Sequence, residues 1–559
     1  MVVAAAQTIA GLDHETRQII LESLKDFSRR ELQDETLRKI DAGSDFPETI
    51  VRQLVGPEMG LHLLFIPEEQ GGMEAGAADI CRVCEFLAGV DLGIATSVLA
   101  TALGIDPIHV GGTDEQKNRW LSQIAEDGNL VAYGVTEPGA GSNVASLKTR
   151  AERIERDGRT VAYRLNGTKV FITNGGVADV YTILAKTPDG PSFFVVERGA
   201  NGLNPGREED KHGIRASNTS EVVLEDVEVP ADQLLGLEEG QGLVHASKVF
   251  GYTRLMVAAF GLGAGADALK RAVEYARDRV QFGSPLIAKQ GYTHKLLIPN
   301  IINMQAARAY IQEVADRLDR GEQDLAVEAS AAKLFATESG CRAADAAVQA
   351  HGGYGYIREF HVEKIRRDVR ITTIYEGTSE IQQEIVGRGR WREVLIGKGK
   401  LYTDMADEMM RLHERHPDLG ADRLAQAATA FVELVRRARK AKLGRQQYIV
   451  FLLADATVAV ETTAALVRKA AIVKDQAEDL ASYWPEAMAT MARIQAGKAG
   501  NQVATSAALI LESTNTANLA EEQGLLAPAS LFGSMRGVVA DMDRLATLIA
   551  SEDLVSDPL

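Results

Sequence analysis

The sequence predicts a mainly α-helical protein with a β domain inserted between helical regions. Apolar residues recur at helical spacing from about residue 8 to 128, and the period changes to two between about 129 and 235. Helical spacing returns from about residue 241. At 559 residues the chain is too long for one hydrophobic core, so several domains are expected, with boundaries near residues 128 and 240.

Composition narrows the class of protein. Hydrophobic residues make up 45% and charged residues 25%, as in ordinary soluble globular proteins. The formal net charge of −17 argues against a nucleic-acid partner, whose phosphates require a basic face. Three cysteines exclude a disulfide framework and indicate a reducing compartment. Cys81 and Cys84 lie in a helical pattern without a second pair or a nearby histidine cluster, so we expect two half-buried cysteines and no metal site.

Targeting signals are not evident. We find no apolar run that approaches the ~20 residues of a membrane-spanning helix. The start of the chain, Met1–Gln7, lacks a charged segment and a full apolar segment of the kind found in signal peptides. A cytoplasmic protein is therefore expected.

The first helical region has one clear start and one unusual helix. Asp13 can cap a helix over Thr16–Leu32, because its carboxylate can accept from the first free N–H groups. The stretch Ile94–Ile108 is apolar and rich in small residues. Such a helix either packs closely on its neighbours or lines a cavity.

The region of period two contains a loop suited to a ligand. The strand Val131–Val135 leads into Thr136–Asn143, whose glycines and hydroxyls could cradle an anionic or heterocyclic group. Asn166-Gly167 predicts a type I′ hairpin turn between Val161–Leu165 and Lys169–Thr173. Further strands are expected at Tyr181–Ala185, Ser192–Glu197 and Glu221–Leu224.

Glycines in the second helical region indicate close backbone approach. Gly261, Gly263 and Gly265 do not have the spacing of a dinucleotide fingerprint, so we expect them to pack helix against helix. Three glycines also interrupt the pattern within Gln349–Tyr356. His351 in that stretch has no partner at metal-ligand spacing, and no metal is assigned to it.

Arg279 is the cation that best suits a phosphate in this region. Its planar fork can grip two oxygens of a pyrophosphate, and Gln281 and Gln290 lie nearby in the sequence. An exposed arginine that makes only surface ion pairs is the alternative.

The octapeptide Thr373–Glu380 contains the strongest candidate for catalysis. Glu376 stands between Tyr375 and Gly377, and apolar neighbours disfavour the charged form of a carboxylate and raise its pKa, as a general base near neutral pH requires. The same stretch also fits a helix N-terminus, with Thr378 or Ser379 as the cap. Glu380 would then lie in the first turn, where the helix dipole favours an acid. Both interpretations can hold together.

Taken together, these segments resemble the acyl-CoA dehydrogenase family. The matching segments follow the order of the family: Tyr133–Ser142, Lys169–Asn174, Gly213–Ser217, Arg279–Gly283, Gln349–Gly353 and Ile374–Gln382. The resemblance implies an N-terminal helical domain (1–128), a central β-barrel-like domain (129–240) and a C-terminal four-helix bundle (241–390). Residues 391–559 lie beyond the usual family length and resemble the appended helical domain of the very-long-chain acyl-CoA dehydrogenases.

The resemblance implies FAD as the cofactor. The flavin-cradling positions would be Tyr133, Val135, Thr136, Gly141 and Ser142, with Phe171 against the isoalloxazine and Thr173 on its N5 edge. The family often has tryptophan where Phe171 stands. The positions that would hold the ADP half across a subunit interface are Arg279, Gln281, Phe282, Gln290, Gln349, Gly352 and Gly353, completed by Thr378 and Glu380. A site of this kind implies a homo-oligomer, with a dimer favoured and a tetramer as the alternative.

The resemblance also implies a CoA thioester substrate. Glu376 would remove the α-proton while the β-hydrogen leaves as hydride to the flavin, giving a trans-2-enoyl-CoA. Some branches of the family carry the base at the position of Thr253, which cannot serve here. The implied substrate contacts are Ser142, Tyr252, Thr253, Arg254, Tyr375, Gly377 and Arg388.

The resemblance implies the substrate class and the electron acceptor less directly than it implies the cofactor. Glutaryl-CoA-type members carry an arginine in the cavity helix where this chain has Ile94, and Ala95, Ser97, Val98 and Leu99 leave an apolar wall. A monocarboxylic acyl chain of medium to long length is expected, with an electron-transferring flavoprotein as acceptor. An acyl-CoA oxidase or an enoyl-CoA reductase would use the same site. A flavoprotein scaffold that docks through the extension is an alternative of a different class.

The extension combines an apolar face with a basic segment. Leu424, Ala428, Phe431 and Val435 share one helical face. The basic run Arg436–Lys442, with Arg445, precedes the apolar run Tyr448–Leu453, a combination that can lie on anionic lipid. Peripheral contact at the inner face of the membrane is one interpretation, and a solvated helix face is the other.

Overall fold

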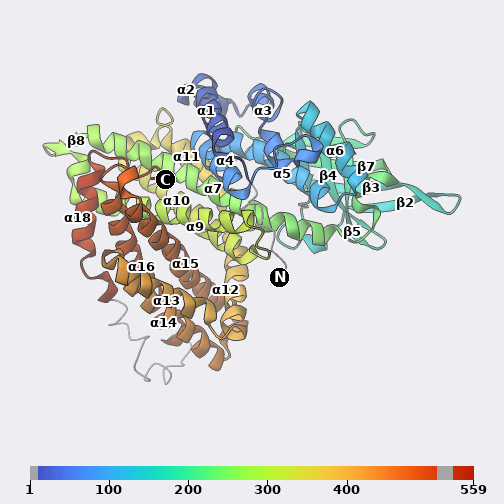
Figure 1. The fold of residues 1–559 in the computed structure, drawn as a ribbon. Coiled ribbons are helices and arrows are strands. Elements are labelled where there is room, and N and C mark those ends of the chain that lie inside the picture. Colours follow the sequence, from blue (N-terminus) through green and yellow to red (C-terminus); the bar gives the residue numbers. More distant parts are fainter. Residues whose placement is uncertain (1–10, 513–532, 559) are drawn as a thin grey trace. The chain divides into compact units, whose positions relative to one another are not determined.

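The computed structural model describes residues 11–512 and 533–558, apart from the side chains of Phe250 and Tyr252. The chain divides into two compact units, each described by itself (Figure 1). The first unit contains Met1–Met256, Ala315–Gln323 and Arg367–Ile371. The second contains Val257–Val314, Asp324–Arg366 and Thr372–Leu559.

The first unit begins with helices, as predicted. They are α1 (His14–Glu31), α2 (Asp34–Gly43), α3 (Glu48–Val55), α4 (Ala77–Val90), α5 (Leu92–Gly111) and α6 (Asp114–Asp127). Asp13 caps α1 by accepting a hydrogen bond from the Thr16 N–H at 2.9 Å. Cys81 and Cys84 are free thiols buried on α4, and burial raises the pKa of both.

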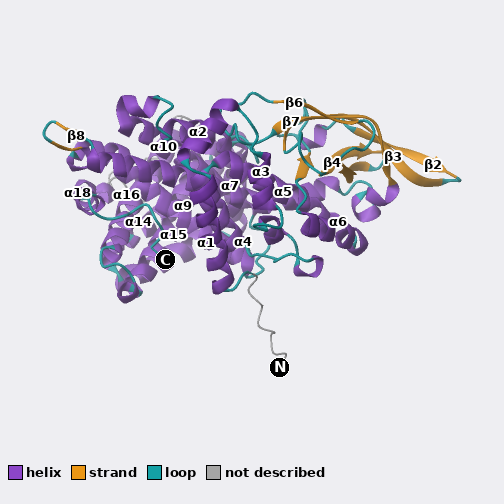
Figure 2. Ribbon diagram, turned by 90° about the horizontal axis from the view of Figure 1, so that it is seen from above, coloured by secondary structure: helices purple, strands orange, loops and turns teal. Residues whose placement is uncertain are grey.

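The β domain is one seven-stranded sheet in the order β1-β4-β2-β3-β7-β6, with β5 paired to β4 (Figure 2). The strands are β1 (Val131–Gly134), β2 (Arg150–Arg156), β3 (Arg159–Thr173), β4 (Val180–Thr187), β5 (Gly190–Glu197), β6 (Leu203–Glu208) and β7 (Thr219–Pro230). Leu184 and Phe193 share a core with Ile105 of α5 and Trp120 of α6. Their neighbours along the strands form a second core inside the β domain, as alternation along a strand requires.

The predicted hairpin at Asn166-Gly167 is wrong. β3 runs through both residues without a break, and the turn before it is Asp157-Gly158, with φ angles of 52° and 72°. The Asn166 amide instead donates to Asp226 of β7 at 3.0 Å. Gly167 lies so close to Thr149 that a Cβ would come within 2.4 Å of its Oγ1. These long-range contacts, and not a turn, explain the Asn-Gly pair.

Strands β2 and β6 were not predicted. The sequence of β2, Arg-Ala-Glu-Arg-Ile-Glu-Arg, is mostly charged and exposed, so it shows little apolar alternation. It is held mainly by pairing with β3, which local pattern does not reveal.

The second unit is helical. α7 (Gly242–Asp278) begins in the first unit and continues into the second, where α9 (Ile298–Asp319), α10 (Ala326–His351), α11 (Val362–Val369) and α12 (Ser379–Ile396) follow. Gly261 of α7 lies against α10, where a Cβ would come within 2.7 Å of Thr337 Cα. A Cβ on Gly340 would come within 2.2 Å of the Gly261 carbonyl oxygen. A Cβ on Gly265 would come within 2.8 Å of Gly340 Cα, so the predicted close helix packing is confirmed for Gly261 and Gly265.

Residues beyond 396 form further helices. They are α13 (Lys400–Arg415), α14 (Ala421–Lys440), α15 (Gln447–Asp475), α16 (Trp484–Glu512) and α18 (Val538–Ile549). α15 packs against α12 and α16, and α13 packs against α14 (Figure 1). The predicted apolar face of α14 is buried in this packing.

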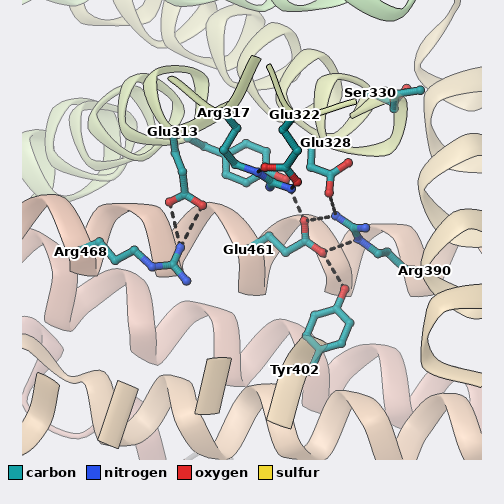
Figure 3. A network of polar contacts seen from close by, with 11 residues as sticks. Glu313, Arg317, Glu322, Glu328, Ser330, Arg390, Tyr402, Glu461 and Arg468 are labelled. Carbon is teal, nitrogen blue, oxygen red and sulfur yellow. Dashed lines mark hydrogen bonds and ion pairs between the residues drawn. The ribbon is translucent and has the colours of Figure 1, made fainter. Parts of the chain in front are cut away.

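A buried ionic network joins these helices to the rest of the second unit (Figure 3). Glu461 of α15 pairs with Arg390 of α12 through contacts of 2.7 and 3.0 Å. The hydroxyls of Tyr402 and Tyr310 donate to the same carboxylate at 2.6 and 2.8 Å. Arg390 also lies 3.0 Å from Glu328 of α10. Glu461 is 4% exposed and Arg390 8%, so both charges are shielded from water.

Within residues 11–512 and 533–558, three helices are apolar and long enough to cross a membrane by length and composition, contrary to the expectation from sequence. They are α5, α7 and α15, whose apolar windows have mean hydropathy of 1.3, 1.3 and 1.7. Of these windows, 83%, 88% and 83% are buried within the protein. Their apolar side chains therefore serve the protein core.

Candidate active site

In the first unit, the loop after β1 lies against β3. The Val170 N–H donates to the Thr136 carbonyl at 3.0 Å, and the Lys169 amine donates to the Val135 carbonyl at 3.2 Å. Farther along the loop, Cβ atoms on Gly139 and Gly141 would meet nothing within 4 Å. The structure thus brings the predicted loop Tyr133–Ser142 beside the strand that carries Phe171 and leaves open space over its glycines.

A buried ion pair holds this loop. The Lys169 amine lies 2.8 Å from a carboxylate oxygen of Glu137, and both side chains are buried. Glu137 also accepts from the backbone N–H groups of Lys148 and Thr149 at 2.6 and 3.0 Å. Burial lowers the pKa of Lys169 to about 8. Burial alone would raise the pKa of Glu137, but hydrogen bonds from Lys169, Thr149 and Lys148 outweigh it and hold that pKa below its usual value.

Replacing Glu137 by glutamine is expected to destabilise the protein by about 3 kcal/mol at neutral pH, because it leaves the buried Lys169 without its counter-charge. The lowered pKa of Glu137 means that its stabilisation is complete above the unfolded value of 4.5 and is lost as the pH falls through the folded value. Wild type and variant should therefore converge in stability as the solution is acidified. Denaturant midpoints at a series of pH values measure this.

Glu152→Gln is the matched control, since Glu152 lies on β2 and makes an exposed pair with Arg150 at 3.0 Å. A gap between wild type and Glu137→Gln that does not shrink at low pH would contradict the role given to the Glu137 carboxylate.

Phe171 is presented by a bulge. The register between β3 and β7 shifts between Lys169 and Ile172, and Phe171 has a φ of 57° and a side chain that is 66% exposed. Left-handed backbone at a bulky residue is costly, so the surrounding strand contacts must impose it. Thr173 follows in register with Thr219 of β7. An exposed aromatic ring held in this way is a surface that a planar cofactor can cover.

The predicted substrate contacts on α7 are only partly described. Thr253 is fully buried and donates to the Val249 carbonyl at 3.2 Å, and Arg254 is half-buried. The side chain of Tyr252 lies outside the described residues. Thr253 and Arg254 remain predictions as substrate contacts.

The second unit contains a cavity of about 510 Å³ at the ends of α7 and α10. Five of the residues predicted to hold the ADP half line it: Arg279, Gln281, Gln349, Gly352 and Gly353. A Cβ on either glycine would meet nothing within 4 Å, so the glycines leave room for a ligand. The guanidinium of Arg279 and the side-chain amides of Gln281 and Gln349 therefore surround the same cavity.

Aromatic rings form the wall of this cavity. The Tyr275 and His351 rings stack with centroids 4.5 Å apart, and the Arg279 guanidinium lies 5.8 Å from the centre of the Tyr354 ring. Burial lowers the pKa of His351, although the contact of its Nδ1 with the Ala347 carbonyl at 2.8 Å acts in the opposite direction. Phe282 lies at the tip of the hairpin formed by β8 (Val280–Gln281) and β9 (Ser284–Pro285), and it is 97% exposed.

Buried side chains hold the backbone of Glu376 and Gly377. Glu376 has a φ of 53° and Gly377 a φ of 91°. The Gln382 amide donates to both carbonyl oxygens, at 2.9 and 3.1 Å, and the Lys333 amine donates to that of Gly377 at 2.6 Å. Because Lys333 and Gln382 are fully buried, they fix a conformation that a glutamate rarely adopts.

The predicted helix cap beside Glu376 is confirmed. The Thr378 hydroxyl accepts from the Ile381 N–H at 3.4 Å, and Glu380 lies in the first turn of α12. The sequence did not reveal that Lys333 and Gln382 support this turn. A lysine flanked by the small or apolar residues Ala331, Ala332 and Leu334 of α10 is a signal that could have pointed to it.

Two predicted site residues contact the C-terminal helices and their connections. Arg388 pairs with Glu384 and donates to the Gly444 carbonyl at 3.1 Å. Gln290, the first residue of α8 (Gln290–Tyr292), donates to Asp543 of α18 at 2.7 Å. Their roles toward substrate and cofactor remain predictions.

The residues present fit FAD in each unit. In the first, an exposed aromatic ring and a following threonine lie beside a loop with open glycines. In the second, an arginine, two glutamines and two open glycines surround a cavity large enough for a nucleotide group. The guanidinium supplies the charge that a pyrophosphate requires.

Comparisons with known proteins agree with this chemistry. Models of the N-terminal, middle and C-terminal domains of acyl-CoA dehydrogenases match residues 14–127, 132–227 and 240–390. An acyl-CoA dehydrogenase of Bacillus subtilis is 38% identical over 386 residues, which cover 67% of this chain and 98% of that protein. The chain belongs to the acyl-CoA dehydrogenase family. It is an FAD-dependent oxidoreductase that acts on the CH–CH group of an acyl-CoA.

Other members of the acyl-CoA dehydrogenase family extend the comparison. A short-chain-specific acyl-CoA dehydrogenase of Megasphaera elsdenii is 37% identical over 380 residues, 66% of this chain and 97% of that protein. An acyl-CoA dehydrogenase from Bacillus anthracis, solved in complex with FAD, superposes with a TM-score of 0.82 at 25% identity, covering 96% of this chain and 95% of its own. A structure described as the electron transferring flavoprotein of Acidaminococcus fermentans has a TM-score of 0.64 at 33% identity, covering 68% of this chain and 100% of its own.

Proposed function

We propose that this acyl-CoA dehydrogenase oxidises monocarboxylic acyl-CoA thioesters of medium to long chain length to trans-2-enoyl-CoA. The observation that carries the substrate class is the segment Ile94–Leu99 of α5, which is buried and contains no charged side chain. A substrate with a distal carboxylate would need a fixed cation at this wall, because an unpaired charge in an apolar site is costly.

Glu376 is proposed as the base that removes the α-proton. The backbone N–H of the same residue is proposed to donate to the thioester oxygen, which stabilises the negative charge that develops there. Lys333 and Gln382 support this role by fixing the turn through its carbonyl oxygens. Bound FAD supplies the acceptor for the hydride that leaves the β-carbon.

An electron-transferring flavoprotein is proposed as the electron acceptor, supported by the similarity to the Acidaminococcus fermentans structure. A homodimer is proposed as the assembly, with a tetramer as the alternative. The fully exposed ring of Phe282 supports it, because a large apolar side chain at a hairpin tip gains free energy when a second copy covers it.

A cytoplasmic location with peripheral membrane contact is proposed on the basis of the segment at the end of α14. Arg439, Lys440 and Arg445 are exposed, as is the ring of Tyr448. Of the apolar run Tyr448–Leu453 that was expected to meet lipid, the residues after Tyr448 are mostly buried in the protein. The exposed apolar surface of this run is therefore mainly the Tyr448 ring. Binding to anionic vesicles that weakens with added salt would support the contact, and equal binding to neutral vesicles would contradict it.

Anaerobic titration of the purified holoenzyme with acyl-CoAs from butyryl to palmitoyl tests the proposed substrate. Bleaching of the flavin is expected to be fastest with medium to long chains, and glutaryl-CoA should leave the flavin oxidised. If air reoxidises the reduced flavin as fast as the enzyme turns over, an oxidase would be favoured over a dehydrogenase. A flavin that no thioester bleaches would contradict the proposed function.

A further inference from the structure

Both ends of the segment that carries Arg279 and Gln281 are tied to the last described residues of the chain. We propose that residues 538–557, here called the C-terminal brace, position this segment for the ADP half of FAD. The inference rests on the proposed assignment of the ADP half to the cavity of the second unit. All contacts that carry it lie within that unit.

The first tie lies just before Arg279. Arg277, in the last turn of α7, donates from Nη2 to the carbonyl oxygens of Ile549 at 2.8 Å and Glu552 at 2.7 Å. Its Nε also donates to the Ile549 carbonyl at 3.2 Å. Ile549 is the last residue of α18, where carbonyl oxygens lack helical partners and the dipole favours a cation. One guanidinium therefore joins the ends of two helices.

The second tie lies just after the hairpin. The Asp543 carboxylate accepts from the Gln290 amide at 2.7 Å, and the same oxygen lies 3.1 Å from Nε2 of His294. α18 also packs against η6 (Leu286–Ala288), whose first residue lines the cavity, and against the π-helical turn η7 (Thr293–Leu297). Asp543 thus fixes the far end of the segment that begins at Arg279.

The brace is itself anchored on other helices. Arg493 of α16 pairs with Asp541 of α18 at 2.7 Å. Farther on, the Gln305 amide of α9 donates to the carbonyls of Leu554 at 3.0 Å and Ser556 at 2.8 Å, and Lys469 of α15 pairs with Asp557. Leu554 and Val555 are buried, so the end of the brace belongs to the packed interior.

The segment between the ties has little support of its own. Its strands β8 and β9 are two residues each, and residues 278–283 are exposed. A two-stranded hairpin is marginally stable alone, so its geometry depends on what holds its ends. Fixing it before binding lowers the entropic cost of ordering it on the cofactor. Arg277 and Asp543 are therefore positioning residues for the cavity.

The test uses Arg277→Met and Asp543→Ala in the full chain. Each apoprotein, prepared by removing the flavin, is titrated with FAD, and quenching of flavin fluorescence gives the dissociation constant. The constant is expected to rise about three- to tenfold in each variant, as the loss of one or two charge-assisted hydrogen bonds implies. Arg544→Gln is the matched control, because Arg544 follows Asp543 and makes an exposed pair with Glu486 at 3.2 Å. It should bind FAD as wild type does.

Limited trypsin digestion of the apoproteins gives a readout that needs no cofactor. Cleavage after Arg279 and Lys289 should be faster in both brace variants than in wild type and Arg544→Gln. Wild-type FAD affinity together with wild-type cleavage in both variants would overturn the brace. A wild-type protein that binds no FAD would overturn the assigned cofactor site, and the cleavage rates would still decide whether the brace orders the segment.

Discussion

Replacing Glu376 by glutamine is expected to abolish reduction of the flavin by acyl-CoA while thioester binding stays largely intact. Glutamine has nearly the same size, but its amide cannot take the α-proton. The backbone of the turn should persist, because Lys333 and Gln382 donate to the carbonyl oxygens of Glu376 and Gly377, which the substitution leaves in place. The loss should reach at least the 10²- to 10⁴-fold range typical of a general base. Rapid mixing under anaerobic conditions measures the rate of bleaching.

Glu393→Gln serves as the control for this variant, because Glu393 is an exposed glutamate on the last turns of α12. It should reduce its flavin at the wild-type rate. Near-normal bleaching in Glu376→Gln would show that another group removes the proton.

The second large effect is expected in the buried network of Figure 3. Glu461→Leu leaves the Arg390 guanidinium with Glu328 alone and removes the acceptor of two tyrosine hydroxyls. Arg390 attraction and these hydrogen bonds hold the pKa of Glu461 low despite its burial, so the lost carboxylate is a charged one. The free energy of unfolding is expected to fall by about 3 to 5 kcal/mol. Denaturant unfolding, with hydrogen exchange of α13 and α15 peptides, measures the loss.

A double variant separates the cost of the poorly paired Arg390 guanidinium from the other contacts that are lost with Glu461. Glu461→Leu with Arg390→Met removes both charges of this pair, and replacing a buried pair by apolar groups is often nearly neutral. Part of the stability should therefore return, and the remainder is the cost of taking Arg390 away from the buried Glu328. Asp404→Asn, which removes the exposed pair with Lys400, should change stability by less than about 1 kcal/mol. A double variant no more stable than Glu461→Leu would contradict the cost assigned to the unpaired guanidinium.

Features decided by neighbouring residues could be predicted from the sequence. Asp13 and Thr378 cap their helices because a cap needs only the next turn, and Gly261 packs closely because its missing Cβ is itself the signal. The open space over Gly139 and Gly141 and at Gly352 and Gly353 agrees with the local glycine signal for the same reason, and the role of these residues toward the cofactor stays a prediction.

Features decided by distant residues could not be predicted. The Asn166-Gly167 pair carries a strong local turn signal, but Asp226 and Thr149 determine its conformation. Arg390 and Glu461 are 71 positions apart, and Gln290 and Asp543 are 253 apart. No local pattern links such pairs, so the contacts of α15 and α18 with these residues emerged only with the structure.

The contact between Gly340 and Gly261 has a consequence for the width of the cavity lined by Arg279 and Gln349. α7 continues for ~26 Å from Gly261 to its end at Asp278, the residue before Arg279, and α10 continues for ~14 Å from Gly340 to Gln349, at 1.5 Å per residue. Arg279 and Gln349 both line the cavity. Rigid helices carry a change of spacing along their length, so a methyl group at residue 340 would widen the gap between a guanidinium and an amide several turns away. If this cavity holds the ADP half of FAD as proposed, substitutions at Gly261 or Gly340 are expected to weaken the retention of flavin, although neither residue lines the cavity.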